Sequence, residues 1–246
     1  MKKIDEALLR GLVLGHAKIP VPALYLETGQ VPVRYLLACR RLLYLQTILQ
    51  RDSDELIHKV YIAQKAAPSP GDFCQLVDKD RQLLDCLFTD EQIASISKYD
   101  FKTILKKKAK EEAFRTLMAI KESKSKMDNI SYTNTFQTQP YLTSTSRTNS
   151  SLLMALRTRT VRGIRSEFGE MYSSKQCPLQ GCSAPDSLPH TLICQVLIAA
   201  VPEPSLVQYG DVFSDIVALQ ETAVTRFALL LEARERILDS NDTQSP

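Results

Sequence analysis

One short segment near the carboxyl end holds most of the residues that could bind a metal. It contains three of the six cysteines and one of the three histidines of this 246-residue chain. They follow the pattern Cys177-x4-Cys182-x7-His190-x3-Cys194. Three thiolates and one imidazole form a complete tetrahedral ligand set for zinc, and a site without an open position is structural rather than catalytic. The segment therefore predicts one structural zinc ion.

The residues between these ligands favour the local structure that such a site needs. A proline and Gly181 favour a turn between the first two cysteines. Asp186 or Ser187 can cap a helix that has Pro189 in its first turn. The histidine and the last cysteine would then project from one face of that helix, one turn apart. The alternative is a loop-to-helix junction with metal-free buried cysteines and a surface histidine.

Composition and charge limit the classes of protein to which the chain can belong. The chain is 44% hydrophobic and 24% charged, which is ordinary for a globular protein. No signal peptide and no membrane-length apolar run is evident, so we expect an intracellular protein whose cysteines are thiols and metal ligands. Residues 98–126 carry ten Lys and Arg against four acids, whereas residues 201–246 carry three against eight. The basic body favours a polyanionic partner, although lysine-rich helices are more commonly just well solvated.

The spacing of apolar residues predicts an all-α fold made of helical bundle segments. Apolar positions recur three and four residues apart, and no strand-rich or alternating β/α pattern is present. A short extended piece at 24–26 should lead into a turn at Thr28-Gly29. Cys39, Cys74 and Cys86 match no metal motif and are expected in the core. The predicted helices cover 4–16, the residues from Pro32 through Ile48, 54–64, 73–87, 90–97, 100–119, a segment from Asn149 or Ser150 toward Phe168, and 216–238.

The helix that begins at Pro32 is predicted to bury one stripe of side chains. Arg40 interrupts this stripe, and because a cation in an apolar face usually pairs with an acid, Glu27 is the nearest candidate partner. The other members of the predicted stripe are Val33, Leu36, Leu37, Leu43, Tyr44, Thr47 and Ile48.

The chain is predicted to divide into two helical regions. Residues 1–126 form the first. Residues 127–148 are rich in Ser, Thr, Asn and Gln without periodicity, which predicts a flexible linker or a surface-hugging loop. Residues 149–246 would hold an arginine-rich helix, the zinc-knuckle-like loop and the C-terminal helix.

Two basic helices supply the candidate nucleic-acid contacts. At 3.6 residues per turn the arginines of the second helix would share one side, where they repel one another. These arginines either bind the phosphates of a nucleic acid, which arginine contacts bidentately, or form ion pairs with the acidic tail of the chain. The candidates are Lys106, Lys107, Lys108 and Lys110 on the first helix and Arg157, Arg159, Arg162 and Arg165 on the second.

Several segments together carry a family resemblance over about residues 4–238. They are Leu24-Tyr25-Leu26-Glu27-Thr28-Gly29, Arg40-Arg41-Leu42, Ala63-Gln64-Lys65, Gly71-Asp72-Phe73, Leu156-Arg157-Thr158-Arg159, the cysteine cluster and Tyr209-Gly210-Asp211-Val212-Phe213. They resemble the region just downstream of the polymerase domain in non-LTR (LINE-type) retrotransposon reverse transcriptase proteins, including its Cys-Cys-His-Cys zinc motif. The family usually has two residues between the first cysteines. The four present here indicate either an expanded turn or a site that has drifted.

The resemblance implies a non-catalytic, nucleic-acid-binding C-terminal fragment of such a protein. Residues 1–126 resemble the post-polymerase thumb and linker region, and the implied partners are RNA, DNA and the rest of the retroelement protein, in the nucleus. The polymerase Asp-Asp pair is absent, no nuclease constellation follows Cys194, and neither a Gly-rich phosphate loop nor a nucleophile paired with His16 or His58 is present. We therefore do not expect an enzyme. The alternative is a helical protein-interaction module, or a relic with no nucleic-acid role.

Overall fold

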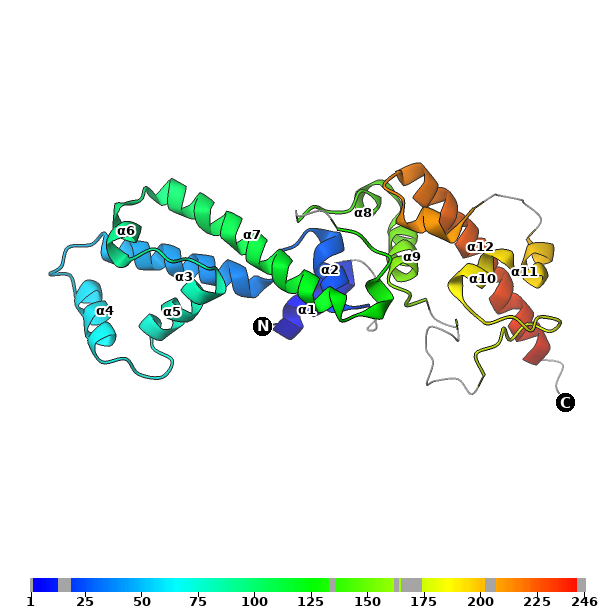
Figure 1. The fold of residues 1–246 in the computed structure, drawn as a ribbon, viewed down its shortest axis with the longest axis horizontal. Coiled ribbons are helices and arrows are strands. Elements are labelled where there is room, and N and C mark those ends of the chain that lie inside the picture. Colours follow the sequence, from blue (N-terminus) through cyan, green and yellow to red (C-terminus); the bar gives the residue numbers. More distant parts are fainter. Residues whose placement is uncertain are drawn as a thin grey trace. The chain divides into compact units, whose positions relative to one another are not determined.

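The computed structural model describes residues 2–12, 19–132, 136–161, 164, 174–201 and 207–242 (Figure 1). Within these ranges the chain forms α-helices and short 3-10 helices, with one isolated β-bridge and no strand. The predicted all-α fold is confirmed. No helix in the described part of the chain combines the length and apolar character that a membrane crossing requires.

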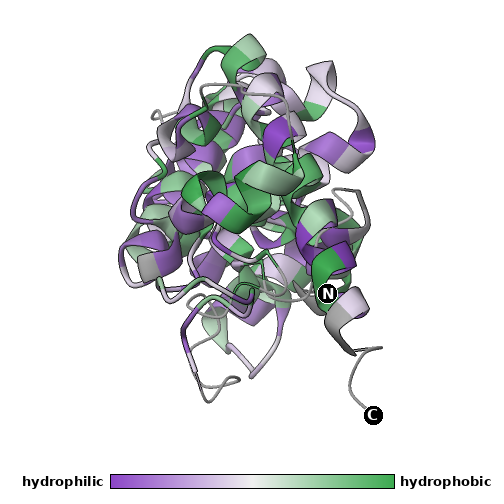
Figure 2. Cartoon of the chain, turned by 90° about the vertical axis from the view of Figure 1, so that its right-hand side faces the viewer, coloured by the Kyte–Doolittle hydropathy of each residue, from purple (hydrophilic) through white to green (hydrophobic). Residues whose placement is uncertain are grey.

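Hydrophobic and hydrophilic stretches are interspersed over the helices, as the green and purple parts of the ribbon in Figure 2 show. Their bounds are α1 Lys2–Leu12, α2 Val21–Thr28, α3 Val33–Leu49, α4 Leu56–Ala66, α5 Phe73–Leu83, α6 Asp90–Ser95, α7 Lys98–Glu122, η1 Ser125–Met127, α8 Tyr141–Ser144, α9 Arg147–Arg157, α10 Leu188–Ile193, α11 Gln195–Ala200, η3 Tyr209–Phe213 and α12 Val217–Asp242.

The residues before several helices cap them, as their types predict. Asp72 accepts a hydrogen bond from the Gln75 amide, so the helix predicted to follow the Pro-Ser-Pro-Gly-Asp turn begins at Phe73. A reciprocal capping box between Thr89 and Gln92 begins α6. The predicted extended piece at 24–26 is wrong, because α2 covers it. Pro22 lies in the first turn of α2, where a missing N–H is tolerated.

Two helices end on a residue other than glycine in the left-handed conformation. Arg159 has a φ of 51°, and the Thr160 amide donates to the Ala155 carbonyl at 2.8 Å, which closes the end of α9 in a Schellman arrangement. Asp85, with a φ of 47°, ends α5 in the same way. The helix predicted from residue 149 toward Phe168 is therefore present but shorter than predicted, and residues 162–163 and 165–168 of the prediction lie outside the described residues. It begins earlier, at Arg147, and stops at Arg157.

The chain forms two compact units. The first comprises residues 1–6, 25–120 and 132–137, and the second comprises 7–24, 121–131 and 138–246. These bounds differ from the predicted division at 127–148, because parts of that segment belong to each unit. Several of its side chains are buried, namely Met127, Ile130, Phe136 and Tyr141. Most of its other described residues are exposed, which is the pattern of a loop that lies along the surface and not of a free linker.

The first unit is built on α3, which packs against α5 and α6. Its buried face contains Tyr35, Ala38, Cys39, Leu42, Leu45, Gln46 and Ile48. Of the predicted stripe only Ile48 belongs to this face, whereas Leu36 and Tyr44 are exposed. The prediction failed because α3 is apolar on nearly all sides, so periodicity alone did not choose the buried one.

The predicted pair of Arg40 with Glu27 is also wrong. Arg40 is exposed, and the buried Glu27 accepts a hydrogen bond from the Tyr132 hydroxyl at 2.8 Å. The neighbouring Arg41 makes the ion pair instead. It donates to both carboxylate oxygens of the buried Asp80, at 2.5 and 2.7 Å, and joins α3 to α5.

The second unit is built on α12, which packs against α8, α9, α10, α11 and η3. One end of its core joins Tyr209 of η3 to Phe227 of α12, with ring centroids 6.1 Å apart. The other end is a cluster in which Leu230 and Ala233 of α12 lie with Leu197 and with Cys177 and Cys194. The candidate metal ligands are therefore part of this core.

Candidate metal centre

The first two cysteines lie in a short hairpin. Its arms are joined by the isolated bridge between Gln176 and Pro185, by a 2.9 Å hydrogen bond from the Cys177 amide to the Ala184 carbonyl, and by a 2.8 Å bond from the Asp186 amide to the Lys175 carbonyl. The backbone thereby brings both ends of the four-residue spacer together.

A tight turn forms the tip of the hairpin. The Cys182 amide donates to the Leu179 carbonyl at 3.1 Å, and Gly181 has a φ of 82°, which a side chain would strain. Of the two alternatives for the wide cysteine spacing, this geometry fits an expanded turn, because the longer loop still points both sulfurs inward.

The last two candidate ligands come from α10 and its end. The Ser187 side chain accepts a hydrogen bond from the His190 amide at 3.2 Å, and Pro189 lies in the first turn. The predicted start of this helix is confirmed, with Ser187 and not Asp186 as the cap. Cys194 lies one turn after His190 at the junction of α10 and α11, where an extended ψ of 115° separates the two helices.

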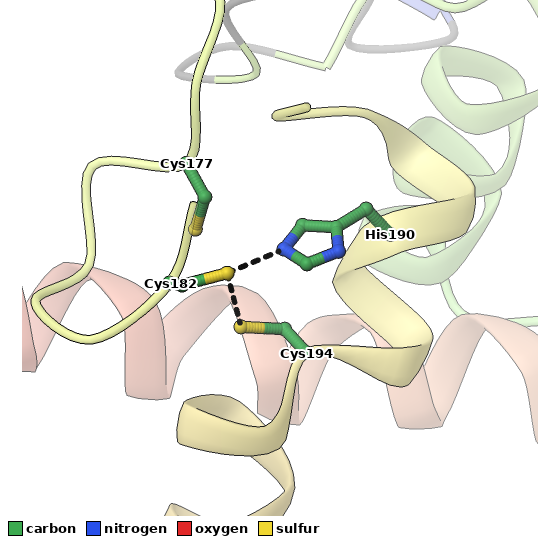
Figure 3. Close-up of side chains that lie close together, drawn as sticks. All are labelled: Cys177, Cys182, His190 and Cys194. Atoms are coloured by element: carbon green, nitrogen blue, oxygen red, sulfur yellow. Dashed lines mark hydrogen bonds between the residues drawn. The ribbon is translucent and has the colours of Figure 1, made fainter. Parts of the chain in front are cut away.

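The four side chains converge (Figure 3). The ligand atoms of Cys177, Cys182, His190 and Cys194 all lie within 4.8 Å of one another. Cys182 Sγ is 3.3 Å from His190 Nε2 and 4.0 Å from Cys194 Sγ. Tetrahedral bonds of about 2.3 Å to sulfur and about 2.0 Å to nitrogen place ligand atoms roughly 3.5–3.8 Å apart. The donor set and its spacing therefore fit a metal ion with four protein ligands.

The environments of two thiols differ. Burial raises the pKa of the Cys177 thiol to about 11 and outweighs the hydrogen bond from the Leu179 amide. The backbone N–H of Ala184 instead lowers the pKa of Cys182. A metal that binds here must displace the proton of the buried thiol, so its affinity should rise with pH.

A buried ion pair joins the hairpin to α12. Arg234 of α12 donates to both carboxylate oxygens of Asp186, at 2.8 and 2.7 Å, and both side chains are almost fully buried. Sequence reasoning assigned Asp186 only a possible capping role and missed Arg234. No local signal identifies this pair, because its members lie 48 residues apart.

The candidate phosphate contacts are not equivalent. Lys106 and Lys110 are exposed on α7. Lys107 lies 3.9 Å from Glu111 and Lys108 lies 3.1 Å from Asp85. Arg159 is half-buried just after α9, and Arg162 and Arg165 lie outside the described residues.

Arg157 is 4% exposed, and its guanidinium donates to the Val212 carbonyl at 3.0 Å. It also lies over the rings of Tyr141 and Phe213, at 5.6 and 5.8 Å from their centroids. The environment is that of a core residue, so the Arg157 guanidinium is not accessible to a phosphate, contrary to the prediction from the sequence.

Comparison of the chain with protein-family models, with curated proteins and with solved structures gave no match.

Proposed function

We propose that the chain is a non-catalytic nucleic-acid-binding region built around one structural zinc ion. The observation that carries the proposal is the convergence of Cys177, Cys182, His190 and Cys194 into one cluster. Three thiolates and one imidazole suit zinc, and four protein ligands leave no position for a substrate. When bound, the ion would contribute folding free energy to the second unit.

The resemblance to the region downstream of the polymerase domain in LINE-type reverse transcriptase proteins supports the choice of partner. We infer that the protein binds the RNA of a retroelement or its target DNA, possesses no polymerase or nuclease activity of its own, and acts in the nucleus together with the rest of that machinery.

The phosphate contacts would come chiefly from α7. Among the described residues, no acid lies within ion-pair distance of Lys106 or Lys110. Lys107 and Lys108 have acidic neighbours, but such solvent-exposed pairs are weak and can exchange for phosphate. Arg159, Arg162 and Arg165 remain part of the proposal as further contacts.

A salt titration with a labelled single-stranded RNA tests the proposal. The logarithm of affinity should fall linearly with the logarithm of salt concentration, with a slope of about −0.7 per phosphate contact. Removing both charges in Lys106→Gln/Lys110→Gln should reduce the slope by about 1.4. Lys59→Gln, an exposed position on α4, should leave the slope unchanged. A flat response, or no binding at low salt, would contradict the nucleic-acid role and favour a protein-interaction module.

A further inference from the structure

A groove of about 560 Å³ lies between α3 and α7 of the first unit. Figure 1 shows the two helices that form its walls. Its volume lies in the range of pockets that hold small molecules or a few side chains, roughly 300–1,000 Å³. The residues that line it are Val31, Leu36, Cys39, Arg40, Leu43, Lys102, Lys106, Ala109 and Lys110.

The floor of the groove is aliphatic. Leu36 is 47% exposed although it belongs to a well-packed helix, Val31 and Leu43 are half-buried, and Ala109, which also lines the groove, is buried. No aromatic ring is among the described lining residues. Exposed aliphatic surface of this kind costs free energy until another apolar surface covers it.

The rim of the groove is uniformly cationic. Lys102, Lys106 and Lys110 are spaced four residues apart, so they form a row on one face of α7 with steps of about 6 Å. Arg40 faces them from α3. All four are exposed, and the described lining contains no acid that would neutralise them.

We propose that this groove binds an amphipathic acidic helix of a partner protein. Apolar side chains at helical spacing would cover Leu36 and Leu43, and carboxylates one turn apart would match the lysine row. The aliphatic floor decides against nucleic acid as occupant, because exposed bases stack on aromatic rings and phosphates gain nothing from aliphatic contact. The inference does not depend on the zinc ion. Lys106 and Lys110 are also proposed phosphate contacts, so RNA and the acidic helix would compete for this rim.

Fluorescence anisotropy on the full chain tests the groove with three probes. The first is a labelled peptide of about four helical turns, with leucines on one face and glutamates flanking them. The second carries glutamine in place of glutamate, and the third is a single-stranded uridine oligonucleotide. We expect saturable binding of the glutamate peptide and about tenfold weaker binding of the glutamine peptide, since three or more surface charge pairs are lost.

Matched variants place the peptide in the groove. Leu36→Ser should weaken peptide binding about fivefold and leave RNA binding unchanged, because it removes apolar contact without removing charge. Leu87→Ser, the same change at an exposed position outside the groove, should affect neither. Lys106→Gln should weaken peptide binding about twofold. Lys107→Gln should leave peptide binding unchanged, because the Lys107 side chain lies beside Glu111 and does not line the groove.

Three results would overturn the proposal. One is the absence of saturable binding of the glutamate peptide, and another is equal binding of the glutamine peptide. The third is an effect of Leu36→Ser on RNA alone, which would make the groove a nucleic-acid site. Circular dichroism of each variant shows that the fold is retained.

Discussion

At the scale of single residues, the position of a cation decides what it can do. Arg157 and Lys106 were both candidates for phosphate contact because the sequence surrounds them with other cations. In the structure Arg157 is buried and donates to a carbonyl, whereas Lys106 is exposed. A buried guanidinium that has hydrogen-bond partners stabilises the fold that supplies them, and its removal leaves those partners unsatisfied.

Replacing Arg157 therefore tests the fold and not a binding site. Arg157→Met keeps most of the side-chain volume but leaves the Val212 carbonyl without this donor. We expect the free energy of unfolding to fall by about 2–3 kcal/mol in urea denaturation. Arg115→Met, at an exposed position on α7, should cost less than about 1 kcal/mol. Equal effects of the two substitutions would contradict the structural role of Arg157.

At the scale of elements, one carboxylate joins three helices of the first unit. Asp90 at the start of α6 accepts hydrogen bonds from Tyr61 and Lys65 of α4, at 2.8 and 2.7 Å, and from Arg81 of α5. Burial alone would raise the pKa of Asp90, but the hydrogen bonds outweigh it and lower the pKa to about 2. The ionised carboxylate is thus the form that holds α4, α5 and α6 together.

Because the pKa of Asp90 is lowered in the folded state, the free energy of unfolding should depend on pH in the acidic range. The contribution of Asp90 is fully present above its unfolded-state pKa of about 3.9 and is lost as the pH falls through about 2. Over that window the wild type should lose about 2 kcal/mol more than Asp90→Asn, measured by urea denaturation at each pH. Asp54→Asn, at an exposed position, should keep the wild-type pH dependence. If the free energies of unfolding of the wild type and of Asp90→Asn fall by the same amount over this pH range, the role given to Asp90 is contradicted.

The hairpin of the metal centre depends on a second element, α12, through the pair of Asp186 and Arg234. Removing one partner leaves the other charge buried and unpaired. Asp186→Asn or Arg234→Met alone should therefore lower the free energy of unfolding by about 3–5 kcal/mol. Replacing both partners, as in Asp186→Leu/Arg234→Met, should cost less than the sum of the single changes. Urea denaturation of the four proteins gives the coupling energy. A coupling near zero would show that the pair does not join hairpin and helix.

At the scale of the whole molecule, the parts that depend on local sequence were predictable. The all-α fold followed from helical periodicity over most of the chain. The start of α10 followed from Ser187 and Pro189, and the convergence of the four candidate ligands followed from spacings within eighteen residues. Short segments with strong capping and turn residues specify their structure with little help from the rest of the chain.

The parts that depend on distant contacts were not predictable in this way. The buried face of α3 was misassigned, because apolar residues surround this helix and only packing against α5 and α6 selects a side. The end of α9 was missed, because Arg159 takes the left-handed conformation usually marked by glycine. The partners of Asp186 and Arg41 lie far away in the sequence, where periodicity carries no information.

The zinc content of the purified full chain tests the central claim most directly. We expect one zinc per chain by mass spectrometry under native conditions, retained in His58→Ala and lost in His190→Ala and Cys177→Ser. Because structural zinc contributes folding free energy, the two ligand variants should also show faster hydrogen exchange over residues 174–201. A wild-type chain that carries no metal, or ligand variants that keep their zinc and their slow exchange, would contradict the claim.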